Sequence, residues 1–130
     1  TGGPPDTARH SEGVEIVGRV DSIPAFLAGV AVVAVPVIKG PGTPVKFAEA
    51  LASGAAVAAT TDAAEGCPDA PANTSNDPAE LAAAIAHLLN HPEEAQQRGA
   101  ETRAYALARC PWSVTQQPLV NWVLTGSFES

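Results

Sequence analysis

The chain is predicted to fold as an α/β protein in which a mostly parallel sheet carries helices on both faces. Two runs of β-branched residues and alanine, 30–37 and 55–60, show no polar alternation, which is typical of strands covered on both sides. Segments with helical start and stop signals lie between and after them. Because strands that alternate with helices form parallel sheets, this order predicts the fold class, and 130 residues suffice for one domain.

The first elements are predicted to be a strand and a short helix. Residues 14–20 (VEIVGRV) have the composition of a strand. A helix should follow, because Asp21 or Ser22 can serve as its N-cap and Pro24 falls in its first turn. We expect this helix to stop near Gly29, just before the first of the two apolar runs.

The central helix is predicted to start with Thr43 as N-cap and Pro44 at its first position. It should run to Ser53 and end at Gly54, directly before the strand at 55–60. Its apolar residues recur at helical spacing and predict one buried stripe, formed by Val45, Ala48, Leu51 and Ala52.

The C-terminal half is predicted to be mostly helical. Residues 61–77 should form a loop with a short edge strand around 70–74, and residues 77–80 (DPAE) have a capping-box pattern that starts a helix. A mostly polar helix over 93–108 should lie on the surface. The buried face of the first of these helices is expected to contain Leu81, Ala84, Ile85, Leu88 and Leu89.

The last segment, residues 110–130, is expected to form a docking helix. Cys110-Pro111 should break the polar helix before it. Trp112 and Trp122 are interpreted as packing anchors, with Leu119 and Val123 as further docking residues.

Charge and hydropathy exclude several classes of partner. The net charge is −7 and only seven residues are Lys or Arg, which argues against nucleic acid, because a phosphate backbone needs clustered basic residues. The apolar run 23–38 is interrupted by Pro24, Gly29 and Pro36, so a buried strand explains it better than a membrane span. Contact with a membrane is therefore expected to be peripheral at most.

The cysteines and histidines predict neither a metal site nor a secreted protein. Cys67 and Cys110 have no metal-ligand spacing, and two free thiols in a cytoplasmic protein are the favoured interpretation, with a disulfide as the alternative. We expect His10, His87 and His91 to lie on the surface, because none of them has a nearby acid or cysteine at the spacing of metal ligands.

The chemistry is concentrated around a glycine-rich loop. Gly40 and Gly42 follow a buried strand and directly precede a capped helix, an arrangement that presents backbone N–H groups to a phosphate. Lys46 and Glu49 lie on the helix that follows, and Glu49 falls about two turns into it. A basic and an acidic side chain beyond a phosphate loop indicate a nucleotide or nucleotide-sugar site.

The ordered motifs resemble retaining glycosyltransferases of the GT-B fold, and more narrowly the group-1 family. Residues 40–66 fit the string GxGTxxKxxEAxAxGxxVxxTxxxxEG, and residues 13–21 (GVEIVGRVD) are similar to the strand before the donor site. The helices from residue 77 onward and the Pro-Trp-Ser at 111–113 also follow the family's order. The resemblance covers nearly the whole chain. It implies that residues 1–130 are the C-terminal, Rossmann-like three-layer domain, truncated at its N-terminal strand.

The resemblance also implies roles for individual residues. The helix N-terminus would face the diphosphate of a UDP-sugar or GDP-sugar, Glu49 would accept hydrogen bonds from the ribose hydroxyls, and Lys46 would add positive charge. The base would rest near the loop at 20–23. The implied donor-binding residues are Gly40, Gly42, Thr43, Val45, Lys46, Glu49, Val20 and Asp21.

Two departures from the family pattern bear on activity. Pro41 stands eight residues before Glu49, where a sugar-contacting acid is often found. The resemblance also implies that the family's N-terminal acceptor-binding domain, and the basic residues that neutralise the leaving diphosphate, fall outside these 130 residues. We therefore name no catalytic residue, and we expect the isolated chain to be inactive. No cofactor is expected besides the donor substrate.

Joined to its acceptor domain, the chain is predicted to transfer a hexose in polysaccharide or glycolipid synthesis. The main alternative is a non-catalytic nucleotide-binding module or a homo-oligomeric remnant that pairs through an open sheet edge. A dinucleotide-dependent oxidoreductase is disfavoured, because no GxGxxG follows the first strand.

Overall fold

The computed structural model describes residues 12–38, 45–109 and 123–126. Its sheet has three strands in the order β1 (Val32–Val35), β2 (Ala56–Ala59) and β3 (Asn73–Thr74). Both neighbouring pairs are parallel, with Val32 opposite Ala56 and Ala58 opposite Asn73. The predicted α/β class with a parallel sheet is confirmed, and β3 falls within the predicted edge strand.

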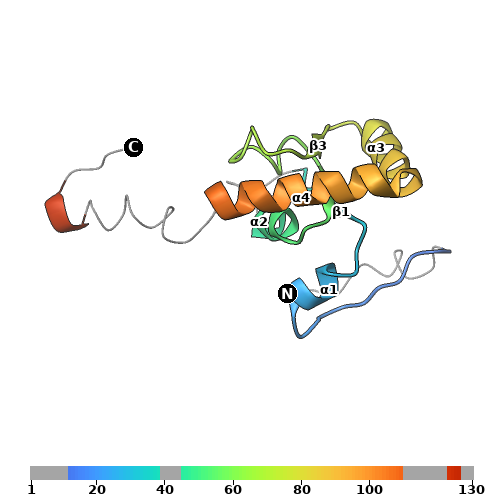
Figure 1. Ribbon diagram of the computed structural model, residues 1–130, viewed down its shortest axis with the longest axis horizontal. Helices are drawn as coiled ribbons and strands as arrows, with labels where there is room; N and C mark the ends of the chain where they lie inside the picture. The colour runs from blue at the N-terminus through green and yellow to red at the C-terminus, as the bar shows by residue number, and fades with distance from the viewer. Residues whose placement is uncertain (1–11, 39–44, 110–122, 127–130) are drawn as a thin grey trace.

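Four helices of the described chain surround this sheet: α1 (Ile23–Leu27), α2 (Val45–Ala52), α3 (Pro78–Asn90) and α4 (Pro92–Arg109). Alternate residues of β2 point to opposite faces. Val57 packs with Phe47 and Leu51 of α2, whereas Ala56 packs with Leu88 of α3. The described part of the chain therefore has the three layers of a Rossmann-like domain (Figure 1).

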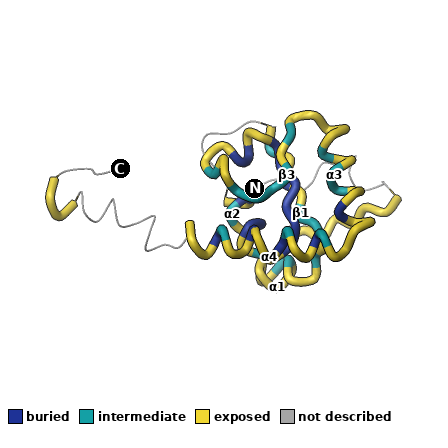
Figure 2. The backbone as a smooth tube through the Cα atoms, turned by 45° about the horizontal axis from the view of Figure 1, so that its top comes forward, coloured by how far each residue is buried: buried dark blue, intermediate teal, exposed yellow. Residues whose placement is uncertain are grey.

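Burial is greatest where β2 meets α2 and α4, and all four residues of β2 are buried (Figure 2). The largest fully buried side chains include Phe47, Leu51, Val57 and Leu88. The predicted stripe of α2 is correct only in part, because Val45 is 72% exposed. The helix instead buries Phe47, Ala50 and Leu51, which share one face at the spacing i, i+3, i+4.

Helix α4 differs most from its prediction. Its outer residues are exposed as expected, but one face packs against α2 and β2 and buries Ala95, Gly99, Thr102 and Ala106. A Cβ atom at Gly99 would overlap the carbonyl oxygen of Gly54 and lie 2.8 Å from its carbonyl carbon. The Thr102 hydroxyl donates to the Ala55 carbonyl oxygen at 3.1 Å. Small residues therefore let this polar helix reach the amino end of β2.

Two predicted helix starts are confirmed. The Ser22 side chain accepts a hydrogen bond from the Ala25 N–H at 3.3 Å, and Asp77 accepts one from the Ala79 N–H at 2.9 Å. The capping box at α3 does not close reciprocally, because Ser75 donates its hydroxyl to Glu80 and accepts from the Asp77 N–H. The predicted face of α3 is partly confirmed: Leu88 is buried, but Leu89 is 57% exposed.

The strand predicted at 14–20 is wrong. These residues are exposed, or half-buried at Val20, and belong to no strand. Val14 and Val17 are 55% and 48% exposed, and Gly18 has a φ of +75°. The physical reason is that a strand needs a hydrogen-bonded neighbour, and the described chain offers none to this segment.

The C-terminal docking segment is described only at 123–126, where residues 123–125 form a helical turn. Val123 and Leu124 are 69% and 77% exposed. Trp112, Leu119, Trp122 and Cys110 lie outside the described residues. No helix in the described ranges is both long and apolar enough to cross a membrane.

Candidate functional site

A cavity of about 520 Å³ lies where β1 passes between α1 and α2. Its walls are mostly apolar, and the two charged side chains among its lining residues both come from α2. The cavity is lined by Ile23, Phe26, Leu27, residues 33–37, Lys46 and Glu49. A mostly apolar pocket with a few polar groups at its rim is the usual form of a small-molecule site.

The geometry of α2 explains why Lys46 and Glu49 meet at this cavity. Phe47 anchors the opposite face of the helix in the core, so the two charged residues, three positions apart, point away from it. Both are exposed. The structure therefore brings together two residues that the sequence singles out, beside the apolar surface of α1.

Glu49 also borders a second hollow of about 210 Å³, between α1 and the carboxyl end of α2. Arg103 of α4 lines this hollow and donates to the Ala52 carbonyl oxygen at 3.5 Å. Residue 103 thus supports the end of α2, since carbonyl groups at a helix C-terminus lack partners within the helix. Sequence reasoning did not find this contact, because it joins residues 51 positions apart.

The other predicted donor-binding residues fall into two groups. Val45 begins α2 and is exposed, while Val20 and Asp21 precede α1 and do not line the cavity. Ile23, at the end of the predicted base-contacting loop, does line it. Gly40, Pro41, Gly42 and Thr43 lie outside the described residues.

Polar residues at the carboxyl ends of the strands form a hydrogen-bonded network that the sequence did not predict. Thr60, directly after β2, donates its hydroxyl to the Val37 carbonyl oxygen. The next residue, Thr61, donates its N–H to the Asn76 side chain at 2.9 Å. Asn76 in turn donates to Asp62 at 3.3 Å. The network joins the loops that follow all three strands, at the end of a parallel sheet where ligands bind.

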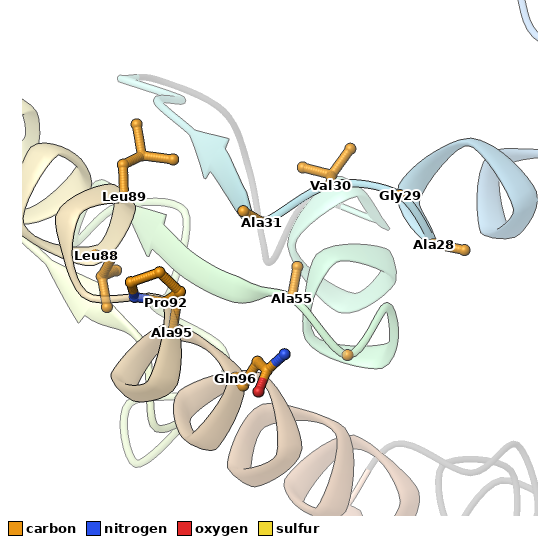
Figure 3. Close-up of a pocket in the computed structure, with 11 residues that line it drawn as sticks. Ala28, Gly29, Val30, Ala31, Ala55, Leu88, Leu89, Pro92, Ala95 and Gln96 are labelled. Carbon is orange, nitrogen blue, oxygen red and sulfur yellow. The ribbon is translucent and has the colours of Figure 1, made fainter.

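Another cavity, of about 430 Å³, lies at the opposite end of the sheet (Figure 3). It is bordered by the residues before β1, by the end of α3 and by the start of α4, and Gln96 carries the one polar side chain that lines it. Ligands of parallel α/β sheets bind beyond the carboxyl ends of the strands, so we assign it no ligand.

Away from the cavity, a hydrogen bond between two side chains links α3 to α4. His87 Nε2 lies 2.7 Å from a Glu94 carboxylate oxygen, a contact between exposed side chains that the sequence did not predict. The hydrogen bond from His87 lowers the pKa of Glu94 from its ordinary value. His87 and His91 are exposed, as predicted, and their rings stack at 4.2 Å.

Tyr105 and Arg109 lie near the end of α4 and form another group of contacts away from the cavity. Burial raises the pKa of the Tyr105 phenol, with Cys67 and Asp69 adding to the effect. The Arg109 guanidinium lies 5.9 Å from the ring centre of Tyr105 and 3.6 Å from a carboxylate oxygen of Asp69. These contacts tie the end of α4 to the loop after β2. None of these residues lines the cavity beside β1.

Comparison with known families adds one finding. The family model described as "Glycosyl transferases group 1" matches residues 2–91. The matched segment contains β1, α2, β2, β3 and α3, and with them Lys46 and Glu49. The chain matches no curated protein and no solved structure.

Proposed function

Because the chain belongs to the group 1 glycosyl transferases, we propose that it is the donor-binding part of such an enzyme. In this proposal it holds a nucleoside diphosphate sugar, UDP-linked or GDP-linked, while a hexose passes to an acceptor. The acceptor would be bound by a separate N-terminal domain, in polysaccharide or glycolipid synthesis. We place this activity in the cytoplasm, where a free thiol such as that of Cys67 stays reduced.

The observation that carries the proposal is the placement of Lys46 and Glu49 on one cavity with an apolar wall. A carboxylate accepts hydrogen bonds from two adjacent hydroxyl groups, which suits the ribose of a nucleotide. The Lys46 ammonium is a compact positive charge that suits a phosphate. The apolar side chains of α1, Ile23 and Phe26, offer a surface for the base.

The same residues would help the transfer step by holding the leaving group. When the sugar leaves, negative charge develops on the nucleoside diphosphate. Lys46 and the amino end of α2 both favour that charge, because helix N-termini carry a partial positive charge. Glu49 would fix the ribose, and thereby the distance between the diphosphate and the helix. We assign these residues binding and orientation, and we assign no catalytic acid, base or nucleophile.

Calorimetric titration with UDP, GDP and their hexose conjugates tests this proposal. We expect binding by the unaltered chain, and an affinity about tenfold lower for Glu49→Gln, since a charge-assisted hydrogen bond contributes about 1.5–3 kcal/mol. Glu93→Gln is the matched control, because Glu93 is also an exposed helical glutamate but lies on α4. Failure of all four ligands to bind would contradict the proposal.

A transfer assay separates the enzyme from a non-catalytic nucleotide-binding module. The chain is mixed with a hexose donor and a glycan or glycolipid acceptor, alone and joined to an acceptor-binding domain of the family. We expect transfer only in the joined protein. Nucleotide binding without transfer in either case would favour the module.

A further inference from the structure

A buried threonine joins the loops that follow the first two strands. Thr60 is 4% exposed, and its hydroxyl donates to the Val37 carbonyl oxygen while it accepts from the Ala63 N–H at 3.2 Å. Its own N–H donates to the Val35 carbonyl oxygen at 3.2 Å. Both hydrogen-bonding capacities of the hydroxyl are thus used, in a place largely closed to water.

The Thr60 hydroxyl holds β1 beyond the point where the strand ends. The ladder between β1 and β2 stops at the pair of Val35 and Ala59. Val37 lies two residues further on, and among the described residues its carbonyl oxygen accepts a hydrogen bond from the Thr60 hydroxyl. Val37 lines the same cavity as Lys46 and Glu49. The threonine therefore supports a wall of the candidate site from behind, although it does not line the cavity.

We propose that Thr60 is a positioning residue for the donor: its hydroxyl fixes Val37 and thereby the cavity wall against which a nucleoside diphosphate rests. The inference rests on the proposed function, because the proposed function is what assigns a nucleoside diphosphate to this cavity. Thr60 acts through Val37 and does not touch the donor. Loss of the hydroxyl frees the carbonyl of Val37 and leaves the Ala63 N–H without its partner.

The chain offers a matched control at the other end of β2. Thr102 is 0% exposed, and its hydroxyl donates to the carbonyl oxygens of Ala55 at 3.1 Å and of Gly99 at 2.9 Å. A change from threonine to valine at either position removes a buried hydroxyl and keeps the branched shape. Both variants should be less stable than the unaltered chain, but only the change at Thr60 removes the hydrogen bond to Val37 in the cavity wall.

The test is calorimetric titration of the whole chain with UDP and GDP, with urea unfolding to verify that each variant is folded. We expect Thr60→Val to bind the tighter nucleotide about tenfold more weakly, the order of effect of one lost hydrogen bond. Thr60→Ser keeps the hydroxyl and should bind the nucleotide as tightly as the unaltered chain does. The affinity of Thr102→Val should stay within about twofold of that of the unaltered chain. Thr60→Ala provides a second variant without the hydroxyl, should the valine variant not fold.

The outcomes distinguish the two proposals. If the unaltered chain bound UDP or GDP and Thr60→Val bound as well as Thr102→Val, the role of Thr60 would be refuted while the donor site stood. If the unaltered chain bound neither nucleotide, the proposed function would be refuted, and the role of Thr60 with it.

Discussion

Gly99 is the residue at which α4 packs against the backbone of Gly54, just before β2. A glycine inside a helix costs about 1 kcal/mol relative to alanine, so its presence there calls for a packing reason. The reason is the backbone at Gly54, which occupies the space that a Cβ atom would need. Gly99 thus lets the polar helix α4 bury part of its length.

We predict that Gly99→Ala lowers the free energy of unfolding by about 2–3 kcal/mol, the cost of overpacking a site that cannot yield. Gly29→Ala is the control, because nothing lies within 4 Å of a Cβ atom there. That variant should stay within about 0.5 kcal/mol of the parent. Urea unfolding measures both, and equal stability of the two variants would contradict the packing argument.

A second prediction at this scale concerns pH. The hydrogen bond from His87 lowers the pKa of Glu94, so the ionised carboxylate is favoured in the folded chain. Its contribution to stability is therefore present above the ordinary glutamate pKa, and it is lost as the pH falls through the lowered value.

We expect Glu94→Gln to be less stable than the parent at neutral pH, with the difference vanishing in acid. Because the side chain of Glu94 is 43% exposed and screened by solvent, the effect should be small. Thermal unfolding across the acid range measures it. Glu93→Gln lies in the same first turn of α4, so it separates the His87 contact from the helix dipole. A difference that persisted in acid, below the lowered pKa of Glu94, would contradict the assignment.

At the scale of an element, α2 shows how the core orients the site. The helix buries Phe47, Ala50 and Leu51 and turns Lys46 and Glu49 toward α1. The stripe predicted from the sequence differs from this buried face, because Val45 and Ala52 fit the helical spacing of apolar residues almost as well as the residues that are buried. Val45 begins the helix at the edge of the core formed by the described residues, and it is 72% exposed.

This orientation predicts unequal effects within one helix. Phe47→Ala should cost about 3–5 kcal/mol, as for other fully buried aromatic residues, and could unfold the chain. Val45→Ala should change the stability by less than about 0.5 kcal/mol. Denaturant unfolding of both variants checks the prediction, and a larger loss at Val45 would restore the stripe predicted from the sequence.

The start of α3 provides a further prediction at this scale. Asp77 accepts from the Ala79 N–H, so Asp77→Ala should destabilise the chain by about 1 kcal/mol. Asp77→Asn keeps the capping oxygen and should cost much less. Urea unfolding compares the two, and equal losses would show that the cap contributes nothing.

At the scale of the whole molecule, the two ends of the sheet differ. Helix α4 packs across the amino end of β2, whereas the carboxyl ends lead into the loops tied together by Thr60, Thr61 and Asn76. The candidate donor cavity lies along β1, which is an edge strand of the described sheet. A ligand there would contact α1, β1 and α2 together.

A ligand that joins three elements should stabilise the entire fold. At a free concentration one hundred times its dissociation constant, UDP or GDP should raise the free energy of unfolding by about 2.7 kcal/mol. Thermal unfolding with and without nucleotide measures this effect. Glu49→Gln should show a smaller increase at the same concentration. An equal increase in both proteins would place the nucleotide elsewhere.

Local patterns in the sequence predict the α/β class, the parallel order of strands and helices, the cap at Asp77, a cap at either Asp21 or Ser22, and the resemblance to the family. These follow from local signals, because alternation, capping side chains and glycine stops act within a few residues. The sequence also singled out Lys46 and Glu49. Packing in the folded chain sets which face of α2 is buried, how α4 reaches β2, that Ser22 is the first cap, and that residues 14–20 form no strand. Those features depend on contacts between distant residues, such as Gly99 with Gly54 and Thr60 with Val37, which no local pattern specifies.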